Sequence, residues 1–214
     1  MELQPVISIG NEAYAEQLAL VVGSAFVSDA LNRAKLLTVD SMTNDAEITV
    51  ERRASYFLPT IRQKALHGAL LVEAANWAAV ALWIPPGVQI PRSEQIGQCI
   101  FSQEYAAKFS ACRSRHLGNR KFWFLDLLGR HPERHERGVI RALLDPFLLK
   151  ARRAGLPAWL EANSLHARDV YTHMGFRVVE EVVIGDGYLD NFGNRVEGGD
   201  GVVIYAMIVE PGTS

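Results

Sequence analysis

The spacing of apolar positions in the first third of the chain changes from strand-like to helical. Residues 6–10 (VISIG) predict a short strand, and residues 11–26 have apolar side chains at helical spacing, with Asn11 as the N-cap. An amphipathic helical pattern continues over residues 29–67 and is interrupted near residues 38–45. The chain therefore opens with one strand followed by a series of helices.

The rest of the chain combines hairpin and crossover signals. Residues 68–87 hold two apolar runs separated by Asn76, which predicts a hairpin, and residues 88–120 predict a loop and then a helix. The later segments are, in order, strand 121–133, helix 138–154, strand 156–164, helix 166–176, strand 177–185, glycine-rich loop 186–201 and strand 202–210. Because hairpins and helical crossovers both occur, we expect an α/β fold with mixed strand directions.

Three prolines punctuate these segments. Pro132 ends the long apolar strand that precedes it. Pro59 and Pro146 lie inside predicted helices, where a proline removes a backbone hydrogen bond. We expect a kink or break at Pro59 and a kink at Pro146.

The composition is that of a globular domain. Of 214 residues, 49% are hydrophobic and 21% charged, which is enough apolar material for a full core. The formal net charge of −2 gives no general attraction to nucleic acid or anionic membrane. We expect one domain over residues 1–214, with an N-terminal part at 1–67, a central sheet and turn helix at 68–164, and a C-terminal part at 165–214.

Cysteine and histidine spacing predicts no metal site. Cys99 and Cys112 form no CxxC pair and are expected to be buried thiols in a reducing compartment. His131 and His135 are separated by a proline-containing turn, and no HExxH motif occurs. No signal-peptide pattern and no apolar run of about 18 residues is present, so we expect a cytoplasmic protein without a membrane partner.

Residues 131–144 (HPERHERGVIRALL) pass from a strand through a charged turn into a helical pattern. Free backbone N–H groups at a helix start suit phosphate oxygens, because they lie at the positive end of the helix dipole. The simpler alternative is that Gly138 only allows the chain to turn. Neither GxGxxG nor GxxxxGK[ST] occurs, so this pattern alone does not identify a nucleotide site.

The order of elements around this turn, ending at Gly175-Phe176, resembles the GNAT N-acetyltransferase superfamily. The turn of that family reads Q/R-x-x-G-x-G/A, and HPERHERGVIRALL is similar to it, with His135 at the Q/R position, Gly138 matching and Ile140 at the last position. Pro132 falls where the family has its proline. The downstream GLPAWLEANS and VYTHMGF look like a fungal or bacterial small-molecule branch.

The resemblance covers about residues 66–210 and implies a mixed, mostly antiparallel sheet that is flanked by helices and splayed between its two central strands. It implies acetyl-CoA as co-substrate, with the pantetheine arm beside the strand at Leu128, Gly129 and Arg130. The side chain of Asn163 would bond the pantetheine amides, although Asn is also common at strand ends and helix caps. The implied pyrophosphate site consists of backbone N–H groups of Arg137, Gly138, Val139, Ile140 and Arg141.

Two residues of the turn depart from the family pattern. Glu136 stands where the family often has glycine, and a carboxylate about 4 Å from a phosphate costs about 1 to 4 kcal/mol, depending on solvent exposure. Ile140 replaces a small residue, and its bulk narrows the approach to the backbone. Arg137 and Arg141 offset the charge, because guanidinium groups bind phosphate oxygens well.

Three side chains are candidates for chemistry. The resemblance puts a general acid at Tyr171, which would protonate the leaving CoA thiolate; the alternative is a core tyrosine bonded to backbone. Asp126 and Glu161 are candidate bases for an amine acceptor, because each interrupts an apolar strand. For both, a salt bridge or an exposed position is the competing explanation. Backbone N–H groups near Leu128 and Gly129 could bind the developing oxyanion.

These features favour an acetyl-CoA-dependent N-acyltransferase that acts directly on a small amine, with no covalent enzyme intermediate. One alternative is a GNAT-fold enzyme that has lost acetyl-CoA and catalyses isomerisation, cyclisation or decarboxylation of a hydrophobic metabolite. Another is a non-catalytic ligand-binding remnant. The acceptor and the oligomeric state are not indicated by any motif.

Overall fold

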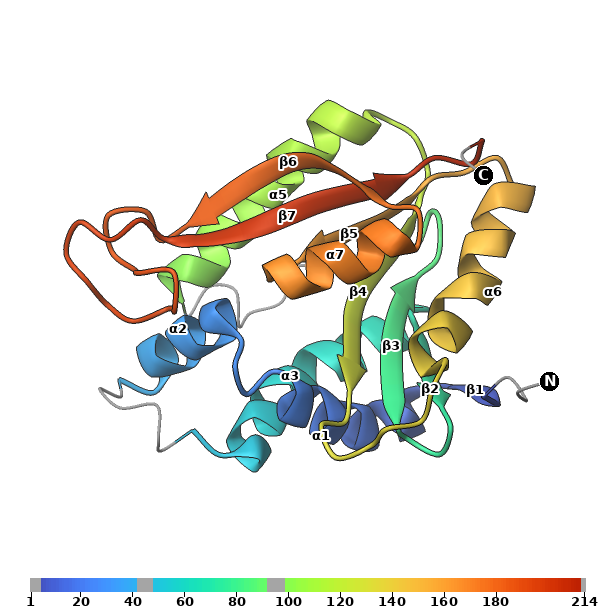
Figure 1. Ribbon diagram of the computed structural model, residues 1–214, viewed down its shortest axis with the longest axis horizontal. Helices are drawn as coiled ribbons and strands as arrows, with labels where there is room; N and C mark the ends of the chain where they lie inside the picture. Colours follow the sequence, from blue (N-terminus) through green and yellow to red (C-terminus); the bar gives the residue numbers. More distant parts are fainter. Residues whose placement is uncertain (1–4, 42–47, 92–98, 213–214) are drawn as a thin grey trace.

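A seven-stranded sheet forms the centre of the computed structural model, which describes residues 5–41, 48–91 and 99–212 (Figure 1). The strand order is β1-β2-β3-β4-β5-β7-β6, and only β4 and β5 are parallel neighbours. The strands are β1 (Ile7–Gly10), β2 (Leu70–Ala74), β3 (Ala79–Ile84), β4 (Trp123–Arg130), β5 (Ala158–Ala162), β6 (Arg177–Ile184) and β7 (Val202–Val209). The predicted mixed, mostly antiparallel sheet is confirmed.

Helices cover both faces of the sheet. They are the 3-10 turn η1 (Glu12–Tyr14), α1 (Ala15–Ala25), α2 (Ala30–Val39), α3 (Val50–Leu66), α5 (Ile100–Leu117), α6 (Val139–Arg153) and α7 (Leu165–His173). Helices α6 and α7 lie on one face, while α1, α2, α3 and α5 lie on the other (Figure 1). No helix in the described ranges is both long and apolar enough to cross a membrane.

Local sequence signals explain most helix boundaries. Asn11, Asp29, Thr49 and Ser164 each cap a helix start, because the side-chain oxygen accepts a hydrogen bond from a backbone N–H in the first turn. Helix α3 continues through Pro59, so the break considered at that position does not occur. The predicted interruption near residues 38–45 begins where α2 ends, and residues 42–47 lie outside the described part of the chain.

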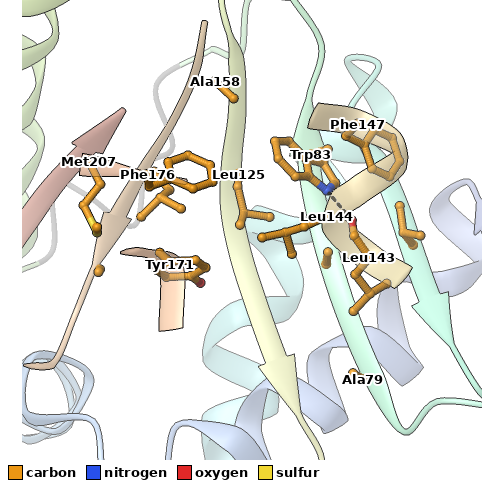
Figure 2. Close-up of a cluster of buried hydrophobic side chains, with 14 of the residues drawn as sticks. Ala79, Trp83, Leu125, Leu143, Leu144, Phe147, Ala158, Tyr171, Phe176 and Met207 are labelled. Atoms are coloured by element: carbon orange, nitrogen blue, oxygen red, sulfur yellow. Dashed lines mark hydrogen bonds between the residues drawn. The ribbon is translucent and has the colours of Figure 1, made fainter. Parts of the chain in front are cut away.

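Alternating side chains divide the core into layers. In β3, Ala81 and Trp83 pack toward α6, whereas Val80 and Leu82 pack toward α1 and α3. The indole of Trp83 donates a 3.1 Å hydrogen bond to the carbonyl of Leu143 in α6 (Figure 2). The same alternation in β5 turns Leu160 toward α7 and Trp159 toward α5.

The sheet opens between β4 and β5. Pairing joins residues 123–125 only to residues 158–160, and the two strands then diverge toward their carboxyl ends. On the other side of β4, Leu82 pairs with Leu127 and Trp83 with Leu125, so Asp126 is the extra residue of a β-bulge. Beyond the paired segment, β4 and β5 each have a backbone edge that no other described strand pairs with. The predicted splay is therefore confirmed.

We predict that Leu143→Ala will lower the free energy of unfolding by about 2 to 5 kcal/mol, since Leu143 is fully buried and its removal leaves a cavity. The matched control is Leu149→Ala in the same helix, where the side chain is 44% exposed and the expected change is within about 0.5 kcal/mol. Urea unfolding measures both variants. Equal losses of unfolding free energy in the two variants would contradict the assignment of Leu143 to the buried face of α6 and Leu149 to its exposed face.

Candidate active site

The turn between β4 and α6 presents unpaired backbone donors. Gly138 directly precedes the first turn of α6. Its φ of 76° is a left-handed backbone conformation that residues other than glycine rarely adopt. Within the described residues, the N–H groups of residues 138–141 have no hydrogen-bond partner, whereas Ala142 N–H bonds the carbonyl of Gly138. These donors point from the start of a 15-residue helix and suit an anion.

The negative charge of Glu136, the acidic residue that departs from the family pattern, is neutralised by a neighbouring arginine. Arg134 donates from Nε and Nη2 to Oε1 of Glu136 at 2.7 and 2.5 Å. Arg134 also donates to the carbonyl groups of Ala75 and Asn76 in the β2–β3 hairpin. Its guanidinium holds the pKa of Glu136 below the usual range. The carboxylate is thus held by Arg134, although Oε2 is buried and accepts no hydrogen bond within the described residues.

The other residues of the turn divide into packed and exposed groups. Ile140, the bulky departure, packs against the hydrophobic core under α6. Arg130 donates to the carbonyl of Arg134 at 3.0 Å and so braces the turn. Arg137 and Arg141, at the two ends of the segment with the free N–H groups, are exposed. This arrangement fits a diphosphate, because it combines backbone donors with two accessible guanidinium groups.

A cavity of about 350 Å³ lies where β4 and β5 diverge. Its walls come from α2, α3 and α5 on one face of the sheet and from α7 on the other. The cavity brings together five residues that the sequence singled out: Asp126, Leu128, Glu161, Asn163 and Tyr171. Gly129 is not part of the lining, since it packs closely against Ala25 in α1.

Tyr171 reaches the cavity from the α6 and α7 face. Its side chain lies between β5 and β4 (Figure 2) and is 9% exposed. Tyr171 belongs to the buried core cluster, and within the described residues its hydroxyl forms no hydrogen bond. Burial raises its pKa well above the usual value of 10, so the phenol is protonated at neutral pH.

The two candidate bases are held differently. Asp126 accepts two hydrogen bonds from one group, the Lys64 ammonium, at 2.6 and 2.5 Å, and its side chain is 12% exposed. Glu161 is 3% exposed and accepts from Tyr105, Arg113 and the indole of Trp159. Both carboxylates therefore form salt bridges, which was the alternative for each. Asp126 accepts two hydrogen bonds and Glu161 three, so Asp126 keeps more spare acceptor capacity.

Asn163 is engaged by a residue that the sequence analysis did not single out as a site residue. Its Nδ2 donates to Oδ2 of Asp29, whose Oδ1 accepts from Asn32 N–H at 2.5 Å and caps α2. Burial raises the pKa of Asp29. The capping position of Asp29 could have been read from the sequence, but its place in the cavity could not.

The cavity also contains cations that carry no sequence motif. Besides Lys64 and Arg113, Lys35 of α2 places its ammonium 4.4 Å from the centre of the Tyr105 ring. Burial lowers the pKa of Lys35, although the carboxylate of Asp29 opposes that effect. The cavity is thus a mixed site, in which carboxylates and cations line the walls together with aromatic rings.

Comparisons with known proteins agree with this geometry. No protein-family model matches the chain. An uncharacterized N-acetyltransferase of Schizosaccharomyces pombe is 27% identical over 124 residues, which cover 50% of this chain and 50% of that protein. A Saccharomyces cerevisiae protein, putative increased recombination centers protein 11, is 33% identical over 88 residues, which cover 41% of this chain and 56% of that protein. The chain spans about half the length of these curated relatives.

Solved structures match nearly the whole chain. A histone acetyltransferase HPA2 and related acetyltransferase from Corynebacterium glutamicum has a TM-score of 0.59 at 19% identity and covers 99% of both chains. Arylalkylamine N-acetyltransferase 2 from Aedes aegypti has a TM-score of 0.61 at 15% identity and covers 98% of this chain and 100% of its own. The splayed sheet, the turn at Gly138 and these structures together show that the chain has the fold of the GNAT N-acetyltransferases.

Proposed function

We propose that the chain is an acetyl-CoA-dependent N-acyltransferase that transfers an acetyl group directly to a small amine. One observation carries the proposal: the helix start with its free N–H groups follows the same strand, β4, whose opening from β5 forms the cavity. Helix α6 packs over β2, β3 and β4, while α7 packs over β5 and β6, so the free edge of β4 lies between them (Figure 1). The start of α6 suits a phosphate group, and the free edge of β4 suits an extended chain with amide groups.

The residues that would hold acetyl-CoA belong to β4 and α6. The N–H groups of residues 138–141, with Arg137 and Arg141, suit the diphosphate, and the unpaired edge at Leu128 suits an extended amide-containing arm. When bound, acetyl-CoA supplies an activated acetyl thioester. Free N–H groups on the β4 edge are donors for the carbonyl oxygen as negative charge develops on it.

The two faces of the sheet have different roles in this proposal. The donor approaches from the face of α6 and α7, because that face contains the helix start and Tyr171. The amine approaches from the face of α2, α3 and α5, where aromatic rings and Asp126 line the cavity. Holding both reactants at the opening supplies much of the rate by proximity.

We assign the two proton transfers to the side chains that have a free acceptor position or a proton to give. Asp126 accepts the proton of the amine, since Lys64 occupies only part of its hydrogen-bonding capacity. Glu161 acts mainly as a structural residue, because three donors already surround it. Tyr171 gives a proton to the leaving thiolate, and its raised pKa keeps that proton available through neutral pH.

The cavity volume and lining favour a small acceptor with an apolar portion. About 350 Å³ is at the lower end for ligand pockets, and several walls are aromatic. The Aedes aegypti structure, which shares the fold, is an arylalkylamine N-acetyltransferase. We therefore propose primary amines with an aromatic or alkyl group as the first acceptors to examine.

A second candidate is a GNAT-fold enzyme that no longer uses acetyl-CoA. The buried, unbonded Oε2 of Glu136 favours it, because a carboxylate oxygen cannot donate to phosphate. The two candidates are separated by incubating the chain with acetyl-CoA and an amine panel and following thiol release. Thiol release together with a CoA-induced thermal shift supports the transferase, whereas the absence of both supports the second candidate.

We predict that Tyr171→Phe will lower kcat by about 10²-fold with little change in stability, because the variant keeps the buried ring and loses only the proton donor. Tyr205→Phe is the matched control, since Tyr205 is buried in the same core cluster but does not line the cavity. Steady-state kinetics measure both. A Tyr171→Phe enzyme with unchanged kcat would exclude this role.

We predict that replacing the two carboxylates by amides will affect different properties, activity for one and stability for the other. Asp126→Asn is expected to lower kcat by about 10²-fold through loss of the base. Glu161→Gln is expected to destabilise the fold by leaving Arg113 without its charge partner, while kcat changes little. Kinetics and urea unfolding of both variants give the comparison, and the reverse pattern would move the base to Glu161.

We predict that Arg141→Ala will weaken CoA binding by up to about 5-fold, the upper end of the range for one exposed charge contact. The effect should shrink at high ionic strength, because salt screens exposed charges. Arg153→Ala, at the other end of the same helix, is the control and should bind CoA normally. Calorimetric titration with CoA measures both, and equal affinities would place the diphosphate elsewhere.

A further inference from the structure

A second group of reactive side chains lies outside the cavity, where α5 packs on β6. Cys112 and His116 are four residues apart on α5, so they lie on one face of the helix, and Glu180 faces them from β6. The Sγ of Cys112 is 3.3 Å from Oε2 of Glu180, and the Nε2 of His116 is 2.9 Å from the same oxygen. All three ligand atoms lie within 4.8 Å of one another.

We propose that Cys112, His116 and Glu180 form a binding site for a zinc-class divalent cation. Sulfur, imidazole nitrogen and carboxylate oxygen are the three ligand types that zinc accepts, and a tetrahedral ion bound by them has one position left for water. Magnesium and calcium prefer oxygen ligands alone, so this donor set selects against them. Binding forms an S–metal bond and releases the thiol proton to solvent, with no change of oxidation state.

The surroundings of the three ligands support this assignment. Arg115 bonds the other oxygen of Glu180 at 2.5 Å and so orients Oε2 toward Cys112 and His116. Cys112 is fully buried, whereas the side chains of His116 and Glu180 are 31% and 28% exposed. An ion therefore reaches the thiol from the side of the other two ligands.

The position of the site gives it a structural consequence. The next residue after Cys112 is Arg113, which holds Glu161 in the wall of the cavity. A cation that joins α5 to β6 would fix the helix turn that carries Arg113. The competing explanation is a hydrogen-bonded contact without metal, in which the thiol only donates weakly to the carboxylate.

Titration with Co²⁺, followed by Zn²⁺, distinguishes these explanations, because a thiolate–cobalt bond gives a near-ultraviolet charge-transfer band. After chelator treatment, the full chain should bind one equivalent of Co²⁺ with this band, and Zn²⁺ should displace it. Cys112→Ser should abolish the band, while Cys99→Ser, at the other buried cysteine, should keep it. His116→Gln and Glu180→Gln should each weaken binding by at least about 10-fold.

The proposal would be overturned by no stoichiometric Co²⁺ binding, by a band that persists in Cys112→Ser, or by a band that is lost in Cys99→Ser. His116→Gln and Glu180→Gln keep the test valid if Cys112→Ser fails to fold, since both side chains are partly exposed. Unchanged Co²⁺ affinity in both glutamine variants would show that these residues form only a hydrogen-bonded contact.

Discussion

The site depends on the short pairing between β4 and β5. Three residue pairs hold the strands together, and beyond them each strand has a free edge and carries one acidic side chain. A carboxylate inside a continuous apolar sheet is costly, and both are stabilised by a cation from a covering helix: Lys64 for Asp126 and Arg113 for Glu161. The same opening gives Tyr171 access to the cavity from the opposite face. Separation of the two strands therefore frees backbone donors on both edges, opens the cavity and places Asp126, Glu161 and Tyr171 at its walls.

Much of the fold could be predicted because its signals are local. Periodicity, caps and turn residues located the strands and most helices, since each depends on neighbours within a few positions. The sequence also marked Asp126 and Glu161, because charged residues stand out in apolar strands. It could not supply their partners: Lys64 is 62 positions from Asp126 and Arg113 is 48 from Glu161. No sequence signal indicated that Lys35 lines the cavity, because its helix carries no motif.

The turn before α6 shows why a single residue that departs from a motif is a poor guide to whether the backbone can still bind an anion. Glu136 looks unfavourable beside a phosphate when it is considered alone, but Arg134 neutralises it and also ties the turn to the β2–β3 hairpin. Ile140 looks too large, but its side chain packs into the core. In both cases the backbone donors after Gly138 stay unpaired within the described residues, and these donors are what an anion requires.

Helix α5 links the two functional surfaces inferred above. Tyr105 and Arg113 of this helix bond Glu161 in the cavity wall, and Cys112 and His116 contact Glu180 of β6. Glu161 and Glu180 lie on different strands, so α5 is held through charged groups at both ends of the β5-β7-β6 part of the sheet. Charged contacts of this kind require defined geometry, whereas apolar contacts tolerate sliding. The position of Arg113, and with it the shape of the cavity, therefore depends on how firmly α5 is attached to β6 through Cys112 and His116.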